Sequence, residues 1–167
     1  NYGYVQTQID IPAYIDYVIS KQYMASDDWP GNNVTCWRER TEGSKWRWFF
    51  YDNNTALWFT DENSIARSIA AGGTQWPNPD WSTLILRNLL RNNNFKQQYI
   101  DRFEYHLQNT FTPERIIHYI DSITDMITPV LEEHIQRWNY PESIASRDEC
   151  IAHMKQFAVD RPAIIRH

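Results

Sequence analysis

The chain contains very little glycine. Among its 167 residues there are only 5 glycines: Gly3, Gly31, Gly43, Gly72 and Gly73. None of them forms a G-x-G-x-x-G or a G-x-x-x-x-G-K-[ST] motif, the loops in which dinucleotide-binding and P-loop proteins bring backbone N–H groups against phosphates. If the chain handles a nucleotide, it does so without a glycine-rich phosphate cradle of its own.

Positive charge and long apolar runs are scarce too. The 16 Lys and Arg residues stand against 21 Asp and Glu, a net charge of −5 with no basic cluster. This balance argues against a nucleic acid or an anionic membrane surface as partner, because both are bound by neutralising phosphates. The apolar runs fall far short of the roughly 20 residues that span a bilayer. We therefore expect neither a nucleic-acid partner nor a membrane span.

Cysteine is limited to Cys36 and Cys150. Neither lies in a C-x-x-C pair, so a zinc site or a thioredoxin-like motif is unsupported. The two residues are compatible with one disulfide or with two buried thiols, and we favour the thiols because free cysteine is commonly buried. The start at Asn1-Tyr2-Gly3, without Met or a signal peptide, is typical of a segment of a longer protein.

Aromatic residues, in contrast, are abundant. Trp, Tyr and Phe make up 15% of the chain, which supplies ample apolar area for a core. The length fits a single domain of the usual size, about 100–200 residues. We therefore expect one folded domain over 1–167.

Helical spacing and capping residues predict most of the secondary structure. Asp10 precedes a helix that should run to roughly Ala25. Thr112 starts a long helix that Pro129 should kink, and a capping box at 146–149 precedes the last helix. Shorter helical patterns occupy 65–70, 83–91 and about 15 residues from Phe95.

Between the first helix and the later ones, the pattern changes to that of a β-hairpin. Two runs, 34–40 and 45–51, flank a turn. In the second run Trp46, Trp48 and Phe50 alternate with other residues, which is typical of a strand with one buried face, and we expect these three in the core. The fold class is therefore α+β, mostly α-helical, with one early hairpin and about five to six helices.

Two groups of oxygen-bearing side chains flank the hairpin. The first comprises Asp27, Asp28, Asn32 and Asn33, and the second comprises Asp52, Asn53 and Asn54. Because a hairpin returns the chain close to its start, the two groups can face each other. Facing carboxylate and amide oxygens make a plausible Mg²⁺ site. The same residues around Pro30-Gly31 are also compatible with a simple helix cap and turn.

The spacing of these residues favours a site. Asn33 follows Asp28 by five positions, the offset between the base aspartate and the metal-binding asparagine of the kinase loop H-R-D-L-x-x-x-N. Asp52 follows the hairpin, as the second metal aspartate of kinases does. In this interpretation Asp28 orients or deprotonates an acceptor hydroxyl, while Asn33 and Asp52 hold metal ions at the phosphates.

The motifs Asp28-Trp29-Pro30-Gly31-Asn32-Asn33, Trp37-Arg38, Lys45-Trp46-Arg47-Trp48 and Tyr51-Asp52 resemble the spore-coat CotH kinase-like family. Later segments resemble the helical half of that family, so the likeness covers nearly the whole chain. It implies the C-terminal lobe of an atypical kinase that transfers phosphate from ATP to protein hydroxyls with Mg²⁺. It also implies a secreted or cell-surface bacterial protein and an upstream N-terminal lobe.

Two departures from the family pattern keep a second interpretation open. The family usually shows D-x-D at the second metal position. Here the place of the second aspartate is taken by Asn54, whose uncharged amide can be an auxiliary ligand at most. In addition, no lysine lies on a strand before the first helix, where a kinase needs one for the α- and β-phosphates. The alternative is a catalytically inactive pseudokinase or an interaction module of a bacterial surface protein.

Overall fold

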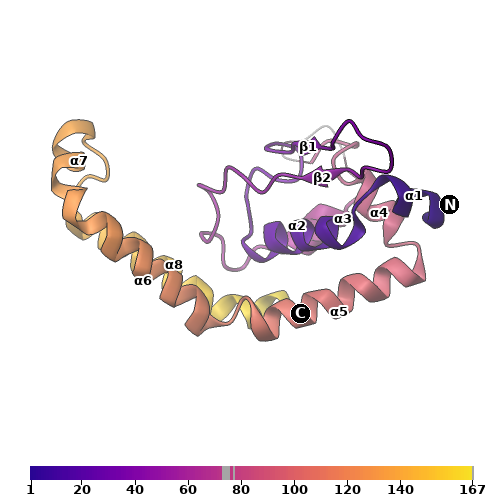
Figure 1. Cartoon of the computed structure of the whole chain (residues 1–167). Helices are drawn as coiled ribbons and strands as arrows, with labels where there is room; N and C mark the ends of the chain where they lie inside the picture. Colours follow the sequence, from indigo (N-terminus) through magenta and orange to yellow (C-terminus); the bar gives the residue numbers. More distant parts are fainter. Residues whose placement is uncertain (73–75, 77, 167) are drawn as a thin grey trace. The chain divides into compact units, whose positions relative to one another are not determined.

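The computed structural model describes residues 1–72, 76 and 78–166 and is drawn in Figure 1. The chain divides into two compact units, Asn1–Tyr105 and His106–His167. Helices make up most of the described structure, and one antiparallel pair of strands accompanies them. The predicted fold class, α+β and mostly α-helical, is confirmed. A single domain over 1–167 stays a prediction.

The first unit is built around one buried helix. Its helices are α1 (Tyr2–Gln8), α2 (Ile11–Tyr23), α3 (Ser64–Ile69), α4 (Leu84–Leu89) and the first part of α5 (Asn93–Asn109). Most side chains of α2 are buried. From α5, the Tyr99 hydroxyl donates to Gln22 Oε1 at 2.5 Å, and Arg102 donates to both carboxylate oxygens of Asp16. These contacts hold α5 against α2 within the first unit.

The ends of α2 follow from local chemistry. The Asp10 carboxylate accepts a hydrogen bond from the Ala13 N–H at 3.3 Å, as predicted for an N-cap, and Pro12 lies in the first turn. The helix ends at Tyr23, two residues earlier than predicted, because Ala25 adopts a left-handed φ of 49°. The chain therefore leaves α2 sharply, and the loop that carries Asp28 begins here.

Asp10 also binds the hairpin, since its carboxylate accepts from Arg47 Nε at 2.8 Å and this pairing lowers the carboxyl pKa.

Asp10→Ala should lower the free energy of unfolding by about 1 kcal/mol, because it removes the helix cap. Asp10→Ser keeps the cap and removes only the half-exposed ion pair, which contributes little. Urea unfolding of the two variants measures the difference, and equal losses would contradict it.

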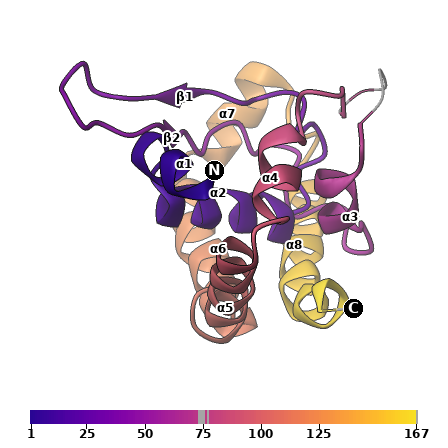
Figure 2. The ribbon, with the colours of Figure 1, turned by 90° about the vertical axis from the view of Figure 1, so that its right-hand side faces the viewer.

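The hairpin is much shorter than predicted. Its strands are β1 (Cys36–Trp37) and β2 (Arg47–Trp48), paired Cys36 with Trp48 and Trp37 with Arg47, instead of the expected 34–40 and 45–51. On the side of the turn the ladder stops because the Trp46 backbone binds residues outside the hairpin: its N–H donates to the Gln8 carbonyl at 2.8 Å and its carbonyl accepts from the Asp10 N–H at 3.1 Å. Figure 2 shows this hairpin, with α1 next to β2.

The aromatic residues of the second strand are only partly in the core. The Trp48 ring packs on Tyr14 of α2, with the ring centroids 4.6 Å apart. Trp46 and Trp48 are half-buried. Phe50 remains 45% exposed, so its predicted place in the core is wrong. The alternating pattern predicted correctly that Trp46 and Trp48 turn toward the protein. It failed at Phe50 because this residue lies beyond the end of β2.

Burial raises the pKa of Tyr14, Tyr17 and Tyr99 above the usual value of about 10. A raised folded-state pKa gives stability that is present below about pH 10 and is lost as the pH rises further. Burial lowers the pKa of Lys21, which acts in the opposite sense, but this is one group against three tyrosines. The urea midpoint should therefore fall between about pH 9 and about pH 11. Circular dichroism with tyrosinate absorbance measures this, and a constant or rising midpoint would contradict it.

The second unit is a helical hairpin with a short cap. Its elements are α6 (Pro113–Ile127), η1 (Thr128–Val130), α7 (Leu131–Trp138) and α8 (Ile144–Ile165). Figure 1 shows α6 and α8 lying side by side, and an ion pair between Asp121 and Lys155 links them. Thr112 caps α6 as predicted. The predicted kink appears as the 3₁₀ turn η1, which contains Pro129.

The structure differs from the sequence-based expectations in one missed helix, one helix cap and the state of the cysteines. Helix α1 was missed because it is short and buries no residue, so no apolar periodicity marks it. The last helix begins at Ile144, and its cap is Ser143, which accepts from the Ser146 N–H at 3.1 Å, so the proposed capping box lies inside the helix. Both cysteines are free and exposed in the described part of the chain, so the expectation of buried thiols is wrong.

Among the described residues, none of the helices is both long enough and apolar enough to cross a membrane.

Candidate active site

The loop that carries Asp28 is fixed by its neighbours. Trp29 is buried, and its indole N–H donates to the Tyr17 hydroxyl of α2 at 3.1 Å. Arg67 of α3 donates to the backbone carbonyls of Asp27 at 2.6 Å and of Ser26 at 2.9 Å. Both flanks of Asp28 are therefore attached to helices, which makes the loop a rigid support for its carboxylate.

Within this loop, two of the predicted site residues touch. Asn33 Nδ2 donates a hydrogen bond to Asp28 Oδ2. Asn33 has a left-handed φ of 52°, a conformation that asparagine tolerates better than most residues. The other oxygen, Asp28 Oδ1, is buried and has no hydrogen-bond partner within the described ranges. A buried carboxylate oxygen without a partner is costly, and a cation or a hydrogen-bond donor from a bound molecule would satisfy it.

The segment after β2 presents its residues in two directions. Asp52 has a left-handed φ of 50° and is exposed, as is Asn54. Asn53 lies between them and turns inward, where its Oδ1 accepts from Ser26 Oγ at 3.4 Å. The segment 51–54 therefore contacts the loop that carries Asp28, as the hairpin argument predicted.

Lys21 also belongs to this region, although no sequence motif pointed to it. Its side chain is fully buried, and its ammonium donates to the Tyr51 carbonyl at 3.0 Å and to Asn53 Oδ1 at 2.7 Å. Lys21 lies on the apolar face of α2, seven residues after Tyr14 and three after Val18. A lysine on an apolar helical face was a signal that sequence reasoning could have used.

The pKa of Lys21 depends on the carboxylates of both Asp28 and Asp52. Burial lowers the pKa of the Lys21 ammonium, while the negative charges of Asp28 and Asp52 act against that shift. Both aspartates are thus near enough to the same ammonium to influence its pKa. The structure brings Asp28, Asn33 and the 51–54 segment into one region of the first unit.

The donor set of this region suits a hard cation. Asp28 and Asp52 offer carboxylates and Asn33 and Asn54 offer amide carbonyls, the oxygen ligands that Mg²⁺ prefers. The unpartnered Asp28 Oδ1 is an oxygen that could face such an ion. The acidic charge is low, however: in the part of the chain that the structure describes, no three His, Cys, Asp or Glu residues gather closely enough to hold a metal by themselves. Amides therefore have to complete the shell.

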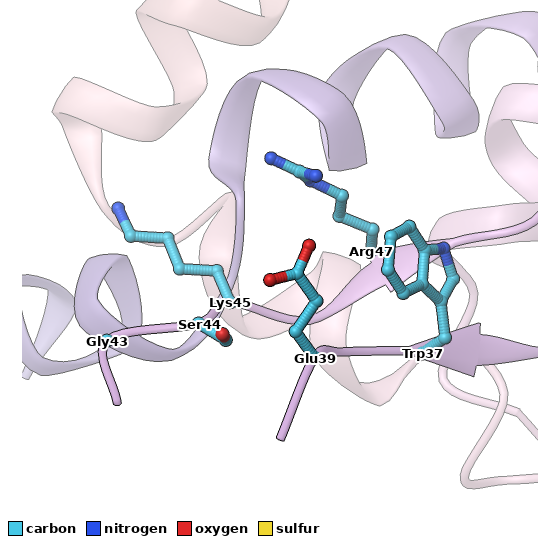
Figure 3. Close-up of a pocket in the computed structure, with 6 residues that line it drawn as sticks. All are labelled: Trp37, Glu39, Gly43, Ser44, Lys45 and Arg47. Atoms are coloured by element: carbon cyan, nitrogen blue, oxygen red, sulfur yellow. The ribbon is translucent and has the colours of Figure 1, made fainter. Parts of the chain in front are cut away.

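A separate hollow of about 220 Å³ lies on the hairpin, and Figure 3 shows its lining. The Glu39 carboxylate points between Lys45 and Arg47, and the Arg47 guanidinium lies 5.9 Å from the Trp37 ring centroid. None of the predicted site residues lines this hollow. The candidate active site is therefore not the hairpin pocket but the region where the two loops meet beside α2.

The family model described as CotH kinase protein matches residues 1–165, nearly the whole chain. No curated protein and no solved structure was found to match.

Proposed function

Since the chain belongs to the CotH kinase protein family, we propose that it forms the helical C-terminal lobe of a kinase that transfers phosphate from ATP to protein hydroxyls. The observation that carries the proposal is the contact between Asp28 and Asn33, with Asp28 Oδ1 buried and unpartnered among the described residues. This pair has the five-residue offset of the kinase catalytic loop, and the segment with Asp52 is held against the same loop.

Each residue has a role in this proposal. Asp28 is the catalytic base: it orients the acceptor hydroxyl and takes its proton. Asn33 fixes the Asp28 carboxylate and offers its own carbonyl oxygen to a cation, as Asp52 does with its carboxylate and Asn54 with its amide. Bound Mg²⁺ would neutralise charge on the ATP phosphates. Positioning and charge neutralisation supply most of the rate enhancement in phosphoryl transfer, because the protein has little covalent chemistry to perform.

The proposal also includes an upstream N-terminal lobe, a protein substrate and a location of the protein. A strand-bearing N-terminal lobe upstream would contribute the lysine for the α- and β-phosphates and the cover over them, which explains why this chain needs so few glycines. A protein substrate follows from the kinase assignment, and we place the protein at the bacterial cell surface or outside the cell.

Calorimetry and phosphate transfer test the proposal with the full-length protein. Mg-ATP should bind, and radiolabelled ATP should label candidate surface proteins. Binding of Mg-ATP without any transfer would indicate a pseudokinase. Absence of nucleotide binding would contradict the proposal and favour an interaction module, an alternative supported by the exposed Asn54 in place of an acid.

A further inference from the structure

Lys21 occupies an unusual place for a lysine. Its side chain is fully buried in the first unit, and its ammonium lies 5.3 Å from the centroid of the Phe50 ring. Two acceptors bind the ammonium, the Tyr51 carbonyl at 3.0 Å and Asn53 Oδ1 at 2.7 Å. These acceptors stand on either side of Asp52 in the chain. The backbone that presents Asp52 is therefore attached to α2 through a single charged group.

The same hydrogen bonds reach the loop that carries Asp28. Asn53 Oδ1 also accepts from Ser26 Oγ at 3.4 Å, and Ser26 precedes Asp28 by two residues. One amide oxygen is thus shared between α2, through Lys21, and the Asp28 loop, through Ser26. Because this oxygen is already bound by the ammonium, Asn53 is a connector between the two halves of the site and not a ligand for a cation.

We propose that Lys21 is a positioning residue of the phosphotransfer site, a fixed internal cation that holds the Asp52 segment against the Asp28 loop and offsets their negative charge. This inference rests on the proposed kinase function. Lys21 does not touch substrate in this role; it acts through Asn53 and the backbone around Asp52. A buried lysine that served only the core would be needed for stability, but it would have no particular effect on the binding of a cation or on transfer.

Removing the ammonium should have two opposite effects at the site. Loss of its hydrogen bonds loosens the geometry between Asp28 and Asp52, and small misplacements of reacting groups slow a reaction strongly. Loss of its charge makes the surroundings of the two aspartates more negative, which favours a divalent cation. A variant that binds the metal more tightly yet transfers phosphate more slowly would carry both effects at once.

The test uses Lys21→Met in the full-length protein, with Mn²⁺ alone as the probe for electron paramagnetic resonance. The dissociation constant for Mn²⁺ should fall by about three- to tenfold, and phosphate transfer should fall by about 100-fold. The matched control is Gln22→Met, which removes the neighbouring buried polar side chain. The Gln22 side chain donates to Ser68 and accepts from Tyr99, neither of which belongs to the proposed site, so its variant should lose stability with Mn²⁺ affinity and transfer unchanged.

Asn53→Ala is a second test of the positioning role of Lys21, for use if Lys21→Met does not fold. It removes the side-chain oxygen that Lys21 and Ser26 share, while the ammonium keeps its charge and its bond to the Tyr51 carbonyl, so transfer should fall at least about tenfold without tighter Mn²⁺ binding. Unchanged transfer in Asn53→Ala, or a Lys21→Met variant that behaves like Gln22→Met, would overturn the inference and leave the proposed function standing. A wild-type protein that neither binds Mn²⁺ nor transfers phosphate would overturn both.

Discussion

Replacing Asp28 by Asn should lower phosphate transfer in the full-length protein by about 10²–10⁴-fold, the usual contribution of a positioned base. The substituted amide keeps the shape of the side chain and can still accept the hydrogen bond from Asn33 Nδ2. Its NH₂ group would then stand where Asp28 Oδ1 is buried without a partner in the described structure. A donor in that place cannot take the proton of an acceptor hydroxyl. Steady-state transfer of radiolabelled phosphate measures the loss.

Asp27→Asn provides the matched control, because it makes the same chemical change one residue earlier. The Asp27 side chain is 54% exposed and its carboxylate lies 3.7 Å from Arg67, which also pairs with Glu62 at 3.3 Å and donates to the Asp27 and Ser26 backbone carbonyls. Transfer should therefore stay within about twofold of wild type, as expected for a surface substitution. An Asp28→Asn variant as active as the Asp27→Asn variant would remove Asp28 from the role of base.

The helix boundaries show which parts of the fold were accessible from the sequence. Asp10 and Thr112 were predicted as caps correctly because a cap depends on the few residues that follow it. The same reasoning placed the start of the last helix at Ser146, although Ser143, also a serine, takes that role. Two possible caps three residues apart are locally equivalent, so tertiary packing has to choose between them.

In the candidate site, too, a contact within one loop was predictable from the sequence and a contact between distant residues was not. The contact of Asp28 with Asn33 lies within one short loop, and its spacing was readable. The connection to the 51–54 segment was predicted from the return of the hairpin, with Asn53 among the residues expected to face the loop, but its partners Lys21 and Ser26 were not predicted. The hydrogen bond between Lys21 and Asn53 joins positions separated by 32 residues. No local pattern encodes such a contact; the only available signal was a lysine on the apolar face of α2.

Substitutions at the second metal position should also have a large effect, here on Mn²⁺ affinity, which one substitution should lower and another should raise. Asp52→Asn should weaken Mn²⁺ binding by about 100-fold, since affinity for hard cations depends strongly on the number of charged ligands. Asparagine is the suitable replacement because the left-handed φ of 50° at this residue would strain alanine. Asn54→Asp should do the opposite and tighten Mn²⁺ binding by about tenfold, because it adds the carboxylate that an amide replaces here.

Titration of the full-length protein with Mn²⁺ measures both changes, and the double variant Asp52→Asn with Asn54→Asp tests whether the two side chains bind the same ion. If the two side chains share one ion, the added carboxylate should recover part of the affinity lost at Asp52, and the two effects should not be additive. Additive effects would mean that the residues act on different ions or through charge alone. Because both side chains are exposed, neither substitution should alter the thermal midpoint appreciably, so a large stability change would point to a structural role for the segment.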